Sequence, residues 1–407
     1  MIYGTTIMDY IHINDSSINR FHNVPNNRDK EGLMPLPKKP PKPPGTPNAK
    51  ALAKPKGTPN KLPYKGWNLF THGVTQSLLQ KFINDEDRYH KKAVLGLKPV
   101  DRKEAMEYGT IFHKLIEEGA RMGHNYSRLE MLRIMSSYMK QVYPSAESTL
   151  LFKIAMAQYN KYKEWEANKP KYNYIAQEPV FNEPFKLPGT RWNPCEEISI
   201  NIPESTIYLR GRIDEVIDRN GELWLQENKT KSRIDIAVLQ DTVPDNIQVM
   251  IYAVAASIKY GRPVAGFIYN VIRKPGQRQR QKESDEDFVA RIEADIAADK
   301  NYYFYRLEYR FKPGQINKWI RESLVPLLYK VYIWWRSIEA NPNNPWVDVE
   351  GNINPFHGRK PFGVYDPMSN GKGDYFDLIV YGRKQGLTVD FDMFSELTEP
   401  EVEVNDD

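Results

Sequence analysis

The stretch Ile207–Lys231, IYLRGRIDEVIDRNGELWLQENKTK, decides the fold of this chain. It contains two runs of strand-forming residues separated by Asn220-Gly221, a dipeptide that tolerates positive φ at both positions of a tight turn. The stretch therefore predicts a β-hairpin with strands over 207–218 and 222–229.

The register of this hairpin brings charged side chains together. A two-residue turn pairs Arg219 with Glu222, so without a bulge Asp214 lies directly opposite Glu227, with Cβ atoms about 5 Å apart. Lys229 stands two residues beyond Glu227 and hence on the same face of its strand. Two carboxylates at this spacing repel unless a cation lies between them. The hairpin thus predicts two carboxylates and an amine on one patch.

Such a patch suits phosphodiester hydrolysis. Carboxylate oxygens bind Mg²⁺ or Mn²⁺, which lowers the pKa of a bound water and neutralises charge on a phosphate. A neighbouring lysine orients that water and stabilises developing charge. An acidic-x-Lys spacing alone is also common on solvated strand faces, so other residues have to decide between the two interpretations.

Hydrophobic periodicity predicts the elements around the hairpin. The order of elements predicts an α/β protein with a mixed sheet flanked by helices and an N-terminal helical region. Asp245 is the expected N-cap of the helix that follows the hairpin. We expect helices over 76–84, 103–122, 129–140, 149–167, 245–260, 286–298 and 315–340, and strands over 174–185, 198–202, 264–272 and 302–311.

The two ends of the chain differ from its body in composition. Residues 35–63 are rich in proline and lysine, which favours a solvated, extended tether or a docking arm. The last 18 residues carry eight acidic side chains and no Lys or Arg, so without them the net charge rises from +5 to +13. A body this basic attracts polyanions, although charge also serves solubility. We expect disordered termini at 1–66 and 390–407 around a domain at 67–389, with a helical part 67–170, a catalytic core 171–340 and a C-terminal extension 341–389.

Several classes of protein are disfavoured by the sequence. No stretch approaches the ~20 consecutive apolar residues of a membrane span, and the first residues lack the pattern of a secretory signal. The single cysteine, Cys195, excludes an intramolecular disulfide and a metal site built from cysteines. These features predict a cytoplasmic protein that does not contact a membrane.

Four motifs, in this order, resemble the RecB-like branch of the PD-(D/E)xK nucleases. They are GTIFHKLIE (Gly109–Glu117), LRGRIDEV (Leu209–Val216), LQENKTK (Leu225–Lys231) and QVMIY (Gln248–Tyr252). The resemblance implies a restriction-endonuclease-like core and metal-dependent cleavage of DNA. It also implies catalytic roles for Asp214, Glu227 and Lys229.

The same resemblance implies a set of residues around the metal. His113, Asp214, Glu227 and the backbone carbonyl of Asn228 are the expected ligands of Mg²⁺ or Mn²⁺. A neutral imidazole ligand shifts the preference toward Mn²⁺. Further residues are expected to line the site or contact DNA (Gln248, Tyr252, Arg273 and Lys274) or to support the ligands (Glu117 and Thr230).

One departure from some relatives concerns an iron–sulfur cluster. Those relatives hold it with cysteines at places that correspond to Leu79–Tyr89 and Asn354–Pro367, and neither stretch contains a cysteine here. We therefore expect no cluster, and packing has to close that region instead.

The function that these patterns favour is an exonuclease in DNA recombination, repair or foreign-DNA processing. The motifs leave open a structure-specific endonuclease, an enzyme acting on RNA, an inactive DNA-binding subunit, and a scaffold. The basic loop Arg273–Lys282 and the aromatic run Tyr302–Tyr305 are candidates for guiding a DNA strand. The arm or the tail is the expected contact for a recombination or replication protein.

Overall fold

The computed structural model describes residues 66–100, 104–122, 127–142, 146–170, 172–195, 198–348, 350–359, 365–366 and 371–390. The Pro/Lys-rich arm and the acidic tail beyond Asp390 lie outside these residues, and so does the end of the Asn354–Pro367 stretch. In the described part of the chain, no helix is long and apolar enough to cross a membrane.

A five-stranded mixed sheet forms the centre, with the strand order β10-β9-β8-β7-β2. The expected fold class, a mixed sheet flanked by helices, is confirmed. Only β8 and β9 run parallel, joined by a crossover through α7 and α8. The strands are β2 (Asn173–Gln177), β7 (Glu215–Arg219), β8 (Glu222–Lys231), β9 (Val264–Arg273) and β10 (Phe304–Arg310).

The predicted turn and its register are confirmed between β7 and β8. Asn220 and Gly221 have φ of 56° and 83°, and pairing runs from Arg219 with Glu222 to Glu215 with Gln226. The next pair would be Asp214 with Glu227, but β7 begins at Glu215 and Asp214 lies in a bend. The direct cross-strand pairing of the two carboxylates was therefore a wrong prediction.

The first arm of the predicted hairpin is two strands instead of one. Its upstream half, β6 (Ser205–Arg212), pairs with β3 (Val180–Leu187) in a separate two-stranded sheet. The predicted strand 174–185 breaks at Glu178, whose φ is 50°, into β2 and β3. The chain changes sheets at both breaks, so Glu178 and Asp214 lie together, and the Glu178 N–H donates to the Asp214 carbonyl at 2.8 Å.

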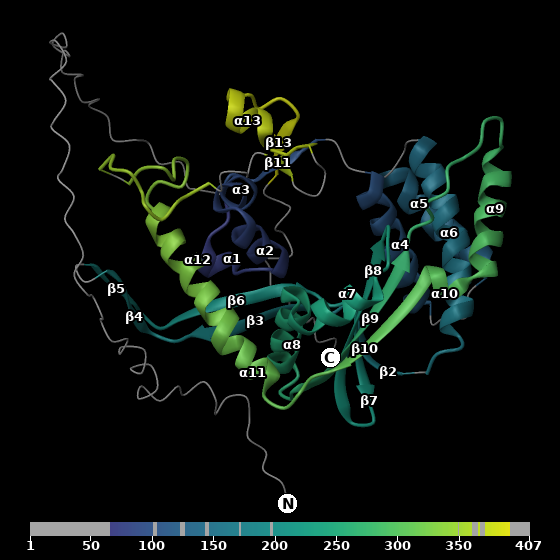
Figure 1. The fold of residues 1–407 in the computed structure, drawn as a ribbon, viewed down its shortest axis with the longest axis horizontal. Helices are drawn as coiled ribbons and strands as arrows, with labels where there is room; N and C mark the ends of the chain where they lie inside the picture. The colour runs from purple at the N-terminus through teal and green to yellow at the C-terminus, as the bar shows by residue number, and fades with distance from the viewer. Residues whose placement is uncertain are drawn as a thin grey trace, which may run out of the picture.

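Helices stand on both sides of the sheet (Figure 1). One group is α1 (Leu69–His72), α2 (Gln76–Asn84), α3 (Glu86–Tyr89), α7 (Ile236–Thr242), α8 (Ile247–Lys259), α11 (Gln315–Trp319) and α12 (Val325–Ile338). The other is α4 (Glu104–Arg121), α5 (Arg128–Val142), α6 (Ala146–Glu166), α9 (Asp285–Ala298) and α10 (Lys300–Tyr303). The remaining elements are β1 (Leu97–Pro99), β4 (Thr190–Cys195), β5 (Ile198–Ile202), β11 (Tyr365–Asp366), β12 (Gly371–Lys372), α13 (Phe376–Tyr381) and β13 (Leu387–Val389).

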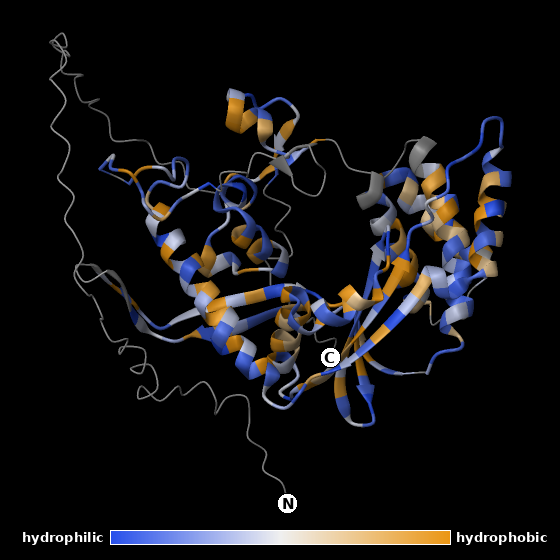
Figure 2. Cartoon of the chain, in the orientation of Figure 1, coloured by the Kyte–Doolittle hydropathy of each residue, from blue (hydrophilic) through white to orange (hydrophobic). Residues whose placement is uncertain are grey.

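Each group of helices covers its own hydrophobic core. Leu225 of β8 belongs to the core that α8 and α12 cover, and Trp224 faces the other way. The second large core joins α4, α5, α6 and α9. Figure 2 shows β9 coloured as hydrophobic along most of its length, and the loop after β9 as hydrophilic. Alternation along β8 therefore places odd-numbered residues toward α8 and even-numbered residues toward α6.

Three local predictions need correction. The N-cap of α8 is Asn246, which accepts the Gln248 N–H at 2.9 Å, because Asp245 is taken up by a short 3₁₀ turn. Tyr302 lies in α10 and not in the strand predicted over 302–311. The helix predicted over 315–340 contains a π-helical turn, Ile320–Leu324, between α11 and α12.

The C-terminal extension packs on the N-terminal helices through a buried imidazole cluster. His357 Nε2 lies 3.6 Å from Asp87 Oδ1, and both side chains are almost fully buried. The Trp334 indole N–H donates to His357 Nδ1 at 3.2 Å, and His90 Nε2 donates to the Pro342 carbonyl at 2.6 Å. Asp87 and His357 belong to the stretches Leu79–Tyr89 and Asn354–Pro367, which lie far apart in the sequence, and polar packing joins them here.

The root of the acidic tail is held by β1. Leu97 pairs with Val389, and the Asp390 N–H donates to the Gly96 carbonyl at 2.8 Å. Lys98 forms an ion pair with Asp390. The end of the described chain is thus fixed beside the helices of the N-terminal part.

Candidate functional site

Glu227 is the best-enclosed carboxylate near the end of β8. Its side chain is 4% exposed, and Oε1 accepts hydrogen bonds from Lys229 Nζ at 2.9 Å and Gln248 Nε2 at 2.6 Å. Gln248 also contacts the Tyr252 hydroxyl at 3.1 Å. Gln248 and Tyr252 are four residues apart in α8, so both side chains lie on the same face of the helix, which faces the Glu227 carboxylate.

Asp214 approaches the same strand from the bend before β7. Its Oδ2 accepts the Asn228 backbone N–H at 2.7 Å, and His113 Nδ1 of α4 lies 3.8 Å from the same oxygen. The Asp214 carboxylate is thus held by the backbone next to Glu227. The structure brings Asp214, Glu227, Lys229 and His113 into one neighbourhood, although through a bend and not through the predicted strand pair.

The electrostatics of this neighbourhood disfavour two free charges. Burial, and after it the charge of Asp214, raises the pKa of Glu227 to about 8. Burial also lowers the pKa of His113, against the attraction of Asp214. Burial therefore favours the neutral forms of both Glu227 and His113. A cation between Glu227 and Asp214 would instead favour the charged form of Glu227.

Glu178 is a site residue that the sequence patterns did not reveal. Burial and the charge of Asp214 raise its pKa to about 7, and Arg212 Nε lies 2.9 Å from its Oε2. A signal was present in Pro179, because proline cannot donate to a strand ladder and is confined to edge strands, strand starts and bulges. The alternating pattern of 174–185 concealed it.

Asn228 is fixed from behind by a row of polar side chains. Asn228, Asn270 and Arg306 are direct partners on β8, β9 and β10. Asn270 Nδ2 donates to Asn228 Oδ1 at 2.9 Å, and Arg306 Nε donates to Asn270 Oδ1 at 2.7 Å. Arg306 in turn contacts both Glu166 oxygens at 2.7 Å. The row holds the backbone segment whose N–H binds Asp214.

The donor types in this neighbourhood are those that a hard divalent cation prefers. In the described part of the chain, however, no group of three or more His, Cys, Asp or Glu side chains is spaced to hold a metal ion as it stands. Glu227 Oε2 is among the buried polar atoms that have no hydrogen-bond partner in that part of the chain, and buried carboxylate oxygens rarely stay unpaired. Carboxylate oxygens with one imidazole are ligands that Mg²⁺ and Mn²⁺ accept.

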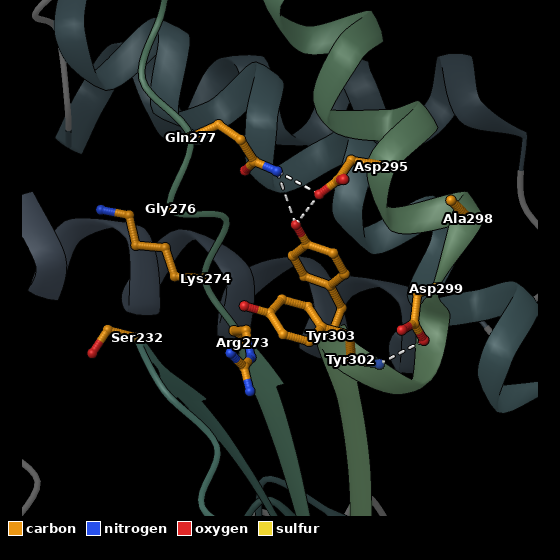
Figure 3. A pocket seen from close by; sticks show the side chains of 10 residues that line it. All are labelled: Ser232, Arg273, Lys274, Gly276, Gln277, Asp295, Ala298, Asp299, Tyr302 and Tyr303. Atoms are coloured by element: carbon orange, nitrogen blue, oxygen red, sulfur yellow. Dashed lines mark hydrogen bonds between the residues drawn. The ribbon is translucent and has the colours of Figure 1, made fainter.

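The other predicted residues take different places. A Cβ on Gly109 would lie 2.9 Å from Thr230 Oγ1, so glycine lets α4 approach β8 there. Glu117 accepts from Lys114 Nζ at 2.8 Å and has no hydrogen bond to Asp214 or Glu227 among those the structure shows. Arg273 is the last residue of β9 and Lys274 follows it, and both line a pocket that Tyr302 also lines (Figure 3).

Comparisons with known proteins identify the family of the chain. No curated protein matches the sequence. A solved structure titled "Crystal structure of SSO0001" is 16% identical over 55% of this chain and 84% of that chain, with a TM-score of 0.19, which is too low to support an argument. Residues 74–315 match the PD-(D/E)XK nuclease superfamily, and this range includes α4, the whole central sheet and α8. The match covers more than half of the sequence, and the chain therefore belongs to the PD-(D/E)XK nuclease superfamily.

Proposed function

We propose that this protein is a metal-dependent deoxyribonuclease that hydrolyses phosphodiester bonds at Asp214, Glu227 and Lys229. One observation carries the proposal. Glu227 is held by Lys229 and Gln248 through one oxygen, and its other oxygen is buried without a partner in the described chain. A divalent cation, bound with Asp214 and His113, would satisfy that oxygen.

The residues of the chain have separate tasks in this proposal. Mg²⁺ or Mn²⁺, when bound, lowers the pKa of a water and neutralises charge on the phosphate. The Asn228 N–H and Gln248 hold Asp214 and Glu227 in place, and the Asn228 carbonyl is a further proposed ligand. Lys229 is 34% exposed, so its amine can reach a phosphate and stabilise the charge that develops on it.

We propose further that the enzyme removes nucleotides from DNA ends, in recombination, repair or foreign-DNA processing. The support is the resemblance of its four motifs to the RecB-like branch. DNA is the proposed partner, since a body of charge +13 without its tail favours a polyanion. The arm and the tail remain the proposed contacts for a recombination or replication protein.

The test compares linear with covalently closed circular DNA, each with Mg²⁺, with Mn²⁺ and with EDTA. We expect release of nucleotides from linear DNA only, and no release in EDTA. Glu227→Gln should lose this activity. Glu222→Gln, on the same strand but paired with Arg310 at the turn, is the matched control and should keep it. Cleavage in EDTA would refute the mechanism, and cutting of closed circles would refute the exonuclease assignment. Binding without cutting would mean that the fold serves as a DNA-binding module.

A further inference from the structure

A pocket of about 590 Å³ lies just past the carboxyl ends of β8 and β9. Ser232, the residue after β8, and Arg273, the last residue of β9, both line it. Ser232 is three residues beyond Lys229, which is about 10 Å along an extended strand. The pocket is therefore a neighbour of the proposed cleavage site, and a role for it in binding substrate rests on the proposed function.

An aromatic ring and a guanidinium form one wall of this pocket. The guanidinium carbon of Arg273 lies 3.8 Å from the centroid of the Tyr302 ring, and Tyr302 is 51% exposed. Figure 3 shows its phenol reaching toward Ser232 and Lys274. Stacking on a cation holds an exposed ring in one orientation, and an aromatic ring beside cations is the combination that single-stranded nucleic acids bind.

The part of the lining next to Tyr302 is braced by hydrogen bonds, and the Tyr303 ring meets the Tyr302 ring edge-on with their centroids 5.2 Å apart. Gln277 Nε2 donates to the Tyr303 hydroxyl at 3.0 Å and also to Asp295, which accepts the Tyr303 hydroxyl as well. Asp299 accepts the Tyr302 N–H at 3.0 Å. Asp295 and Asp299 thus each have an oxygen engaged in holding the lining in place.

Two polar atoms of the lining lack a partner. Arg273 Nε and Gln277 Oε1 are buried and make no hydrogen bond within the described chain. One is a donor and the other an acceptor, and such atoms are usually satisfied by protein, water or ligand. A nucleotide offers both complements, since its phosphate accepts and its base edge donates.

We propose that this pocket holds one nucleotide of an unpaired DNA strand that continues from the cleavage site. Its base lies against Tyr302 with its edge toward Gln277, and its phosphate lies near Arg273 and Lys274. The volume falls in the range of pockets for small ligands, about 300–1,000 Å³. A base inside a duplex has both faces covered by neighbouring base pairs, so only an unpaired base can present a face to Tyr302.

The experiment measures the affinity of a labelled single-stranded oligonucleotide and of a blunt duplex by fluorescence anisotropy in EDTA, where nothing is cut. Tyr302→Ala should weaken single-strand binding about 5- to 150-fold, the loss expected for one stacked base, and leave the duplex unchanged. Tyr302→Phe should bind like wild type.

A matched control is present in the chain. Tyr381 is 55% exposed and has an Arg383 guanidinium 5.0 Å from its ring centroid, but it lies on α13 and does not line the pocket. Tyr381→Ala should leave both affinities unchanged. Thermal unfolding of each variant confirms that it is folded.

Oligonucleotides that lack one base identify the contact itself. Removal of the base at one position of the oligonucleotide should weaken its binding to wild type. The same removal should not change its binding to Tyr302→Ala, because that variant has already lost the stacking interaction with the base. The same series in RNA tests the choice of DNA, and a larger Tyr302-dependent affinity for RNA would overturn it.

The inference fails if Tyr302→Ala binds the single strand as tightly as wild type, or loses duplex affinity equally. Metal-dependent cleavage would persist in that case, so the proposed function would stand. Absence of cleavage by wild type on every DNA substrate would instead refute the proposed function, whatever Tyr302 does.

Discussion

The molecule contains two histidine–aspartate pairs in opposite surroundings. His113 and Asp214 are 3.8 Å apart at the end of β8, and their side chains are 32% and 13% exposed. His357 and Asp87 are 3.6 Å apart between α3 and the C-terminal extension, and are 0% and 2% exposed. The separations are alike, so the difference between the pairs lies in what surrounds them.

The two aspartates differ in the charge of their neighbours, which are basic around Asp87 and include two acids around Asp214. Lys91 and His357 contact Asp87, and they lower its pKa to about 2 although burial acts to raise it. Asp214 has Glu227 and Glu178 beside it, and its charge raises the pKa of both. The basic groups of the first region, Lys91 and His357, lie against the aspartate itself, whereas Lys229 and Arg212 of the second region contact Glu227 and Glu178. This comparison supports the proposal that the second pair binds a cation and that the first pair is structural.

The largest expected difference between the two regions concerns their lysines. Lys229→Ala should lower the cleavage rate roughly 10²–10³-fold, because it removes a group that stabilises transition-state charge. DNA affinity should fall only slightly, since it is spread over many basic residues. Lys91→Ala, which removes the lysine of the structural pair, should leave the rate of the folded enzyme unchanged. Single-turnover cleavage and anisotropy check both, and equal rates for the two variants would remove the distinction.

The second expected effect is the acid sensitivity of the structural region. Burial lowers the pKa of His90 to about 4, with His357 and Lys91 acting in the same direction and the Pro342 carbonyl against it. His90 takes up a proton near pH 6.5 in the unfolded chain but only near pH 4 in the folded chain. The free energy of unfolding therefore decreases as the pH falls from 6.5 to 4. The loss is roughly 1.4 kcal/mol per pH unit, or about 3 kcal/mol in total.

Urea unfolding between pH 7 and pH 4 measures this loss. His90→Gln keeps a donor for the Pro342 carbonyl and removes the titrating ring, so its stability should depend less on pH in this window. A variant with the same pH slope as wild type would show that His90 is not the group responsible.

The smallest expected effect is the stabilisation of the fold by metal. Mn²⁺ at 100 times its dissociation constant should raise the free energy of unfolding by about 2.7 kcal/mol, since it binds the folded state. Glu227→Gln should abolish most of this gain, and Asp87→Asn should retain it from a lower starting stability. A gain that depends on Asp87 and not on Glu227 would reverse the assignment of the two pairs.

The sequence predicted those parts of the fold that depend on neighbouring residues. The Asn220-Gly221 turn fixed the pairing of β7 with β8, and the apolar spacing of Gln76–Asn84 gave the bounds of α2. It did not predict the breaks at Glu178 and Asp214. Those breaks depend on the pairing of β3 with β6, a contact between segments that no local pattern links.

The candidate site shows the same division. Glu227, Lys229, Gln248 and Tyr252 were placed together because two short periodicities, of a strand and of a helix, suffice to align them. Glu178 was missed because its contacts with Asp214 and Arg212 come from a segment more than thirty residues away in the sequence. Tyr302 was assigned to a strand, and only α10 gives it the exposure on which the pocket depends.

The row of Asn228, Asn270 and Arg306 also has a consequence for folding. A tight turn sets the alignment of β7 with β8, but β8 and β9 are parallel and joined by a long crossover, so no turn sets theirs. A slip of β8 by one residue would point Glu227 and Lys229 toward α6 and remove Asn228 from its partner. Such a chain would bury an unmatched carboxylate among apolar groups and leave Asn270 unsatisfied. The row therefore penalises misaligned strands, and it selects the one alignment in which the proposed site exists.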